Sequence, residues 1–333
     1  MPENSRITAL NWQALVDEAL RRRKAEKLTQ REHAALASVS VPTIAAFDRG
    51  ETTLTLAKAF DILRVVGLVE EPSKFSAQDT FVREALARWR ILTNELPEDS
   101  PGRFPHGWYR FDYALDGDLK VVNLDTFEGI LRKSVPRHTG WPVFWFPKRS
   151  EVAPREIDGT IECWLSPEAE NRAFSDAAHC DFWRAAPTGR LFLIRGYLED
   201  GQETFPPRTI FDTTLPIWRI GEALVHAERL SSLMKKDEDS RITVQFRALF
   251  SGLSGRVLRG WANPLSDMLF EGHSARSDEA ALEAVIPAEE IKDHLAEHVT
   301  PLVASLYERF GVTGLSTARV KVEIDRMLSN RLG

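Results

Sequence analysis

The chain has 333 residues, of which 43% are hydrophobic and 28% are charged, and its formal net charge is -6. This composition is that of an ordinary soluble globular protein, and the length predicts about two domains. The negative charge excludes a protein coated with basic surface for indiscriminate nucleic-acid binding, and the two cysteines are too few for a disulfide framework. No stretch approaches the ~20 apolar residues of a membrane-spanning helix, and the polar start MPENSR lacks the apolar core of a signal peptide, so we expect a cytoplasmic protein with no membrane partner.

The N-terminal segment is more basic than the remainder. Residues 1–70 carry ten Lys and Arg against nine Asp and Glu, which gives them a charge of +1 and leaves -7 for the rest. This asymmetry indicates that the N-terminal segment is the part that meets phosphate.

A first amphipathic helix is predicted over residues 11–27. Its apolar residues recur at helical spacing, at Trp12, Leu15, Val16, Ala19 and Leu20. Its end is rich in cations, at Arg21, Arg22, Arg23, Lys24 and Lys27. These cations either form a solvated helix end that suits the helix dipole or face phosphate, and the sequence leaves both alternatives open.

Two short helices separated by a tight turn are predicted next. Residues 29–32 have the pattern of a capping box, so a helix should begin there. After a turn at Ser38, Ser40 is a good N-cap, and Pro42 falls in the first helical turn, where its missing amide hydrogen has no intrahelical partner. A second helix is therefore expected over residues 41–47.

Several residues between positions 29 and 51 follow one recurrent pattern, in its usual spacing and without gaps. They are Thr29, Gln30, Ala34, Val39, Ser40, Ile44, Asp48, Arg49, Gly50 and Glu51. This pattern resembles that of the lambda-repressor/Cro-like (XRE) helix-turn-helix family, and the resemblance spans residues 11–69. The departures are His33 where Leu is usual, Ser38 where the turn Gly is usual, and Asp48 where Glu is usual. Serine adopts the positive φ of that turn less readily than glycine.

The resemblance implies a set of DNA-binding residues. They are Gln30, Arg31, Ser40, Val41, Pro42, Thr43, Ala46 and Arg49. Gln30 would meet the backbone or a base edge, and Arg31 and Arg49 would meet phosphate. Among the groove-facing residues only Thr43 has a hydrogen-bonding side chain, whereas direct readout usually relies on Arg, Lys, Gln or Asn. Base discrimination per half-site should then be modest, which leaves more of the specificity to half-site spacing, DNA shape or dimerisation. The alternative for this segment is a small helical protein-interaction module.

Three regions are expected along the chain. Residues 1–71 form the helix-turn-helix domain, which a helix over residues 52–69 closes, and the linker Glu70-Glu71-Pro72-Ser73 follows. Residues 72–106 hold a connecting helix, over residues 77–96, and a boundary rich in Pro, Gly and acidic residues. Residues 107–333 form a larger domain.

The larger domain is predicted to be α+β. Short apolar runs bounded by turns predict strands over residues 119–124, 142–146, 160–165 and 190–198. A helix over residues 216–234 follows, and then two strands over residues 242–250 and 256–261 that the turn SGLSG joins. Helices over residues 287–310 and 316–328 close the chain. Strands first and helices last are typical of an α+β domain.

Three stretches of this larger domain have a distinctive pattern. They are RLFLIRGYLEDG, FDTTLPIWRIGEALVHAERL and FRALFSGLSGRVL. They resemble the C-terminal region of uncharacterised bacterial proteins that carry a schlafen-AlbA-type DNA-binding domain at the N-terminus. The resemblance implies one C-terminal module joined to different DNA-binding heads, which would make it an effector, sensor or assembly unit.

Candidates for chemistry lie in the same domain. Cys163 and the pair His179-Cys180 lack the second close pair that zinc sites favour, so we expect no metal, and no motif predicts another cofactor. Glu222 and His226 would share a helix face, either as a catalytic carboxylate-imidazole pair or as a surface ion pair. The nine tryptophans are mostly expected in the core, and a few could line a pocket for a flat ligand or stack on bases.

Together these features predict a homodimeric transcriptional regulator, more specifically a repressor, that binds a palindromic operator in double-stranded DNA. The C-terminal domain would then meet an effector ligand or a partner protein of unknown identity. One alternative is a DNA-targeted enzyme or defence effector with its chemistry at Glu222, His226 and nearby arginines. Another is an antitoxin-like protein that binds a neighbouring partner.

Overall fold

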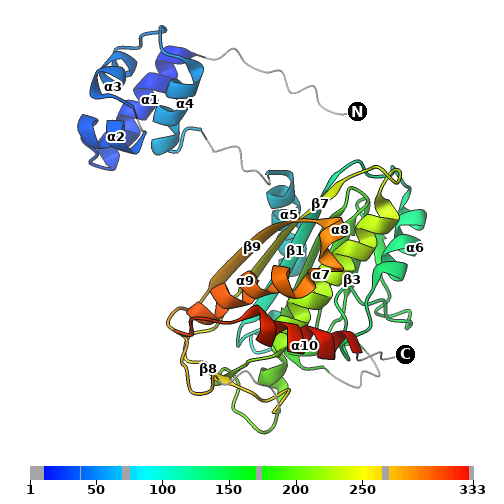
Figure 1. The fold of residues 1–333 in the computed structure, drawn as a ribbon. Coiled ribbons are helices and arrows are strands. Elements are labelled where there is room, and N and C mark those ends of the chain that lie inside the picture. The colour runs from blue at the N-terminus through cyan, green and yellow to red at the C-terminus, as the bar shows by residue number, and fades with distance from the viewer. Residues whose placement is uncertain (1–10, 38, 70–75, 170–174, 265–269, 330–333) are drawn as a thin grey trace. The chain divides into compact units, whose positions relative to one another are not determined.

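A computed structural model describes residues 11–37, 39–69, 76–169, 175–264 and 270–329 (Figure 1). The chain divides into two compact units between Ser76 and Ala77. The start MPENSR, the turn residue Ser38 and the linker Glu70-Glu71-Pro72-Ser73 lie outside the described residues. None of the helices in the described ranges combines the length and the apolar character that crossing a bilayer requires.

The described part of the first unit is helical. Its helices are α1 (Trp12–Ala25), α2 (Gln30–Leu36), α3 (Val41–Asp48) and α4 (Leu56–Val65). Their core consists of Val16, Ala19, Ala34, Ala37, Ile44, Phe47, Ile62, Leu63 and Val66. The four predicted helices are therefore present, and each buries the apolar stripe that its spacing predicts.

Side-chain caps set where these helices begin. The Thr29 hydroxyl accepts a hydrogen bond from the Glu32 amide, and the Glu32 carboxylate accepts one from the Thr29 amide, so the predicted capping box is present. Ser40 caps α3 by accepting from the Thr43 amide, and Pro42 lies in the first turn, as predicted. Asn11 and Thr55 cap α1 and α4 in the same way.

The second unit contains a seven-stranded sheet with the strand order β2-β3-β4-β5-β1-β7-β9. Its neighbouring strands all pair antiparallel. Its strands are β2 (Arg155–Ile157), β3 (Thr160–Trp164), β4 (Phe182–Ala186), β5 (Arg190–Gly196), β1 (Trp108–Gly117), β7 (Ile242–Phe250) and β9 (Ala280–Pro287). A separate parallel pair joins β6 (Ile210–Asp212) and β8 (Val257–Arg259). The α+β prediction is confirmed for this unit.

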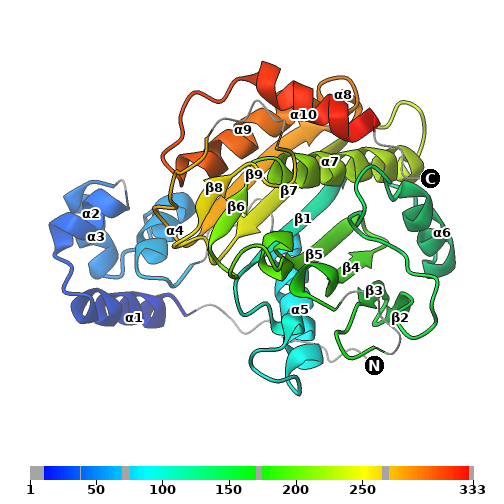
Figure 2. The ribbon, with the colours of Figure 1, turned by 90° about the horizontal axis from the view of Figure 1, so that it is seen from below.

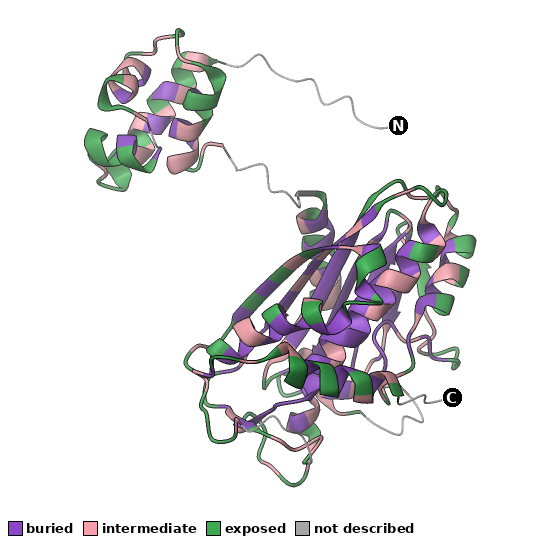
Figure 3. Cartoon of the chain, viewed as in Figure 1, coloured by how far each residue is buried: buried purple, intermediate pink, exposed green. Residues whose placement is uncertain are grey.

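Helices cover both faces of the sheet (Figure 2). On one face lie α6 (Leu124–Ser134), α7 (Leu215–Met234), α8 (Ala288–Ile291), α9 (Leu295–Glu308) and α10 (Thr317–Ser329). The largest core lies between these helices and the sheet, and it includes Phe111 and Phe246 of the sheet and Ile220 of α7. Figure 3 shows this buried layer along α7 and the central strands.

The other face of the sheet carries α5 (Ser76–Thr93), which the sequence assigns to a connector between the domains. Its Phe81 and Ala85 share a core with Phe182 and Phe192 of the sheet, and Gln78 donates a hydrogen bond to the buried Asp112 carboxylate at 3.1 Å. The helix is therefore part of the second unit rather than a connector. The reason is its apolar stripe, which the sheet buries.

Two strand predictions for the second unit are wrong. Residues 119–124 form only an isolated bridge, Leu119 to Lys235, before Asn123 caps α6. Residues 142–146 form a loop whose Phe144 has φ 52° and is buried, so its apolar character serves the core without a strand. The strands predicted over residues 242–250 and 256–261 are present as β7 and β8. They do not pair with each other as a hairpin, because β7 pairs with β1 and β9 whereas β8 pairs with β6.

Candidate nucleic-acid interface

The buried side of α3 fixes which of its residues face outward. Ile44 and Phe47 lie in the core of the first unit. The Trp12 ring packs edge-to-face on Phe47, with 5.5 Å between ring centroids, and its Nε1 donates to the Gly50 carbonyl at 3.0 Å. These contacts hold α3 on α1 and leave Val41 and Pro42 exposed, with Thr43 and Ala46 partly exposed. The residues that the resemblance implies for the groove thus share the outward side of α3.

The polar group on this outward side is a pair of hydroxyls. Oγ of Ser40 and Oγ1 of Thr43 lie 2.8 Å apart, and Oγ of Ser40 also accepts from the Thr43 amide at 3.3 Å. A bond between two hydroxyls uses one of their two hydrogens. One hydroxyl hydrogen therefore stays available to an acceptor outside the protein. A single hydroxyl donor can distinguish few bases.

Asp48, at the end of α3, joins three helices. Its carboxylate accepts two hydrogen bonds from Arg23 of α1, at 3.0 and 2.7 Å, and one from the amide nitrogen of Gln30, at 2.7 Å. The Arg23 and Asp48 side chains are only 13% and 15% exposed. Gln30 is thereby oriented by Asp48, which leaves its amide oxygen as an acceptor for a base or backbone donor.

The exposed cations near α2 and α3 differ in their partners. Arg49 forms an ion pair with Glu51 at 2.7 Å, and both side chains are well exposed, so the pair contributes little stability and can be exchanged for phosphate. Arg31 is exposed and makes no ion pair with any described residue. Of the cations at the end of α1, Arg23 is bound inside the bundle, and Arg21 and Arg22 both pair with Glu18. Hydrogen bonds from these two arginines lower the pKa of Glu18 to about 2.

His33, which stands where the family has leucine, has a partner that leucine could not have. It is buried, and its Nε2 donates to the Ile62 carbonyl at 2.9 Å. This bond ties α2 to α4. The substitution keeps the side chain in the core while adding a link between two helices.

No family model, curated protein or solved structure matches this chain. Its function has therefore to be inferred from the residues and their geometry.

The structure gives Glu222 and His226 separate partners. The Glu222 carboxylate accepts from the backbone amides of His138 and Thr139, at 3.2 and 3.1 Å, and from the Thr139 hydroxyl at 2.7 Å. Nδ1 of His226 lies 2.7 Å from the Tyr113 hydroxyl, and the ring is fully buried. Burial, with a smaller effect of the Arg229 charge, lowers the pKa of His226 to about 3. Glu222 and His226 are therefore buried side chains with different partners. They form neither a surface ion pair nor a carboxylate-imidazole pair.

The cysteines and His179 also have separate surroundings. Sγ of Cys163 donates to the Val152 carbonyl, Sγ of Cys180 donates to the Ser175 carbonyl, and Nδ1 of His179 bonds Asp176 at 2.7 Å. Within the described ranges no group of three or more His, Cys, Asp or Glu side chains is arranged to hold a metal ion.

One buried pair in the second unit was not found from the sequence. Arg195 on β5 is 1% exposed, its Nε donates to Asp181 at 2.7 Å, and its Nη2 makes a second bond to the same carboxylate. The two residues lie fourteen positions apart on different segments. No spacing rule connects them, so only the folded chain reveals the pair.

Proposed function

We propose that the first unit binds double-stranded DNA as a helix-turn-helix domain of the lambda-repressor/Cro-like type, and that the chain is a transcriptional repressor. The observation that carries this proposal is the outward side of α3. There the exposed Val41 and Pro42 lie beside the Ser40 and Thr43 hydroxyls, at the N-terminal end of a helix whose other side is held in the core. A major groove admits such a helix end, and apolar side chains can pack on thymine methyl groups.

Cations and an oriented amide support the same proposal. Arg31 and Arg49 are exposed on α2 and just after α3, where they could meet phosphate on either side of the inserted helix. Gln30, held by Asp48, presents its amide oxygen from the first residue of α2. Phosphate contacts would then position the domain on the DNA and supply most of the affinity. The outward side of α3 would supply a modest preference among bases.

Because one domain would recognise bases only weakly, we expect two chains to pair. Binding of the first domain then places the second at a high effective concentration near its half-site, which raises the overall affinity. The edge strand β9 offers a surface for it. It pairs with β7 in an unbroken one-to-one register, its only charged residue is Glu283, and Val285 is 48% exposed. Edge strands that avoid pairing usually carry Lys, Pro or a bulge along their length, and in β9 the proline is confined to the last residue, Pro287. A second copy could add its own β9 antiparallel across a two-fold axis.

Replacing Thr43 and Arg49 together with alanine is expected to weaken specific DNA binding at least about tenfold, because a hydroxyl contact and a phosphate contact are lost together. The helix content should stay unchanged, since the Ser40 cap uses the backbone amide of residue 43. Binding would be measured by mobility shift, on DNA that the unaltered full chain selects from a random pool.

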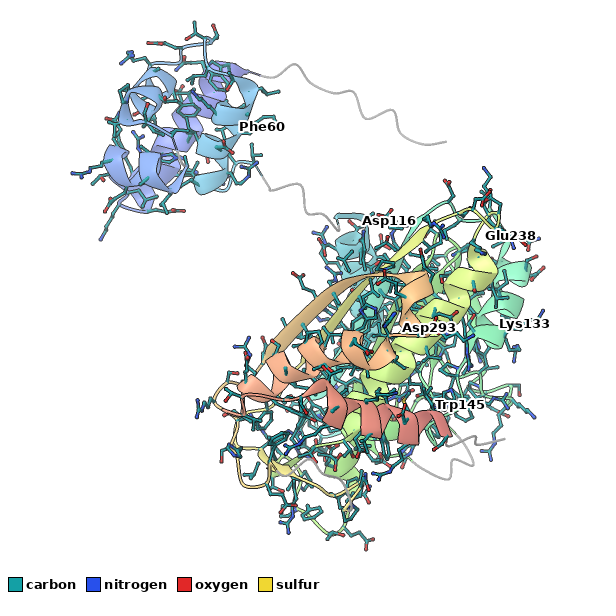
Figure 4. The ribbon with its side chains drawn as sticks, viewed as in Figure 1. Phe60, Asp116, Lys133, Trp145, Glu238 and Asp293 are labelled. Atoms are coloured by element: carbon teal, nitrogen blue, oxygen red, sulfur yellow. The ribbon has the colours of Figure 1, made fainter. Side chains whose placement is uncertain are left out.

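Lys58→Ala is the matched control for this double variant. Lys58 is an exposed cation on α4, the helix that also carries Phe60, labelled in Figure 4. Its loss should change affinity far less than the loss of Thr43 and Arg49. Equal affinity of the double variant and the unaltered chain would rule out the proposed interface.

A further inference from the structure

The second unit contains a cavity of about 820 Å³ that has no part in the proposed DNA interface. Its walls come from segments far apart in the sequence: the loop after α6, the short 3-10 helix Ala177–His179, the first turns of α7 and the residues after β8. All of them belong to one compact unit. The volume lies in the range of roughly 300–1,000 Å³ that is usual for small-molecule sites.

Three tryptophans line the cavity, and each comes from a different segment. They are Trp141, Trp218 and Trp261, and all three are partly exposed, whereas Trp183 of the core is completely buried. Trp141 is held firmly, because its Nε1 donates to Asp181 at 3.1 Å and its ring packs on Trp145 with 4.6 Å between centroids. A partly exposed indole that is held in place in a concave wall, as Trp141 is, is suited to stacking on a flat ring.

The polar groups that line the cavity are cationic or neutral. They include Arg219, His138 and His179, and none of the lining residues is acidic. The nearby carboxylates have partners in the protein: Asp181 binds Arg195, Glu222 binds the backbone amides of residues 138 and 139, and Asp176 binds His179. These three carboxylates are therefore already bonded within the protein, whereas the buried Glu199, next to the lining residue Leu198, lies within the influence of the Arg219 charge.

Arg219 is the strongest candidate for a charged contact. Its guanidinium lies 5.0 Å from the centroid of the Tyr109 ring, and its Nη1 donates to the Tyr109 hydroxyl. It makes no ion pair with any residue in the described part of the chain, and a guanidinium has five N–H donors. A bound oxyanion could accept from the N–H donors of Arg219 that the Tyr109 hydroxyl does not use.

We propose that this cavity binds a small planar aromatic anion, with its ring stacked on the tryptophans and its carboxylate or phosphate on Arg219. Aromatic stacking supplies the area of contact, and the charge-assisted hydrogen bonds of Arg219 select the anion over a neutral ring. This site does not depend on whether the first unit binds DNA.

Calorimetric titration of the full chain with matched probes tests the proposal. The pairs are indole-3-acetate with its neutral amide indole-3-acetamide, and adenosine monophosphate with adenosine, so that the two arms separate a carboxylate from a phosphate. We expect one of the two anions to bind one-to-one, about tenfold or more tighter than its neutral counterpart. Arg219→Gln should remove that preference, and Arg90→Gln, which removes an exposed cation from α5 on the other face of the sheet, should keep it.

A second variant separates loss of the ligand contact from loss of folding, which Arg219→Gln could also cause. Trp261 donates to Asp212 through its backbone amide, which Trp261→Ala retains, so this variant should fold normally and bind the anion at least about tenfold more weakly. The proposal fails if neither anion binds at millimolar concentration, if the neutral probes bind equally well, or if folded Arg219→Gln keeps the preference.

Discussion

Replacing Asp181 with alanine is expected to destabilise the second unit by about 3–5 kcal/mol, the range found when a buried ion pair loses one partner. Arg195 would remain in the interior with no carboxylate to compensate its charge. Burial alone would lower the pKa of the Arg195 guanidinium, yet the Asp181 charge raises it above its ordinary value. The variant would also take away the acceptor of Trp141 Nε1. Urea unfolding of the full chain, followed by tryptophan fluorescence, measures the loss.

The double variant Asp181→Ala, Arg195→Met is the informative control. It removes both charges and keeps an apolar side chain at residue 195, so it should recover a substantial part of the lost stability. A single variant that loses less than about 1 kcal/mol would show that the pair is not the buried anchor described above.

Lowering the pH from 7 to 5 is expected to cost the second unit about 2 kcal/mol through His226 alone. The folded-state pKa of this residue is about 3, against an ordinary value of 6.5. Below pH 6.5 the unfolded chain therefore binds a proton that the folded chain excludes. The stability due to neutral His226 is fully present above pH 6.5 and is lost progressively as the pH falls toward 3.

Comparison with His226→Gln isolates this contribution from other titrating groups. Glutamine can still bond the Tyr113 hydroxyl but does not titrate, so the variant should lose about 2 kcal/mol less than the unaltered chain between pH 7 and pH 5. Urea midpoints and slopes at both pH values give the difference. Identical losses in the two proteins would mean that His226 takes up its proton in the folded state, as an accessible acid-base group would.

Local rules predicted the first unit well, because its helix boundaries depend on neighbouring residues. The Thr29 and Ser40 caps are set within four positions of each helix start.

The central strand β1 was missed for the opposite reason. Its Arg110 and Asp112 interrupt the apolar pattern, and the buried Asp112 carboxylate is stabilised by partners that include Arg247 of the neighbouring strand β7, which donates to it at 2.7 Å. A strand with an interior carboxylate is unrecognisable until its partner strand is known.

The candidate interface was predictable in part. The outward side of α3 follows from helical spacing, since Ile44 and Phe47 are apolar and point the other way. The contact of Asp48 with Arg23 and Gln30 did not follow, because it joins residues on three helices. The sequence raises the possibility that a few tryptophans line a pocket, but it does not indicate which, since Trp141, Trp218 and Trp261 are brought together only by the fold.

Selection of bound sequences from a random pool of double-stranded DNA by the purified full chain tests the central claim most directly. A paired helix-turn-helix protein should enrich a two-fold-symmetric site whose half-site centres lie about one helical turn, ~10 base pairs, apart. Enrichment of a single half-site would contradict pairing. Absence of any enriched sequence would contradict the proposal that α3 reads DNA.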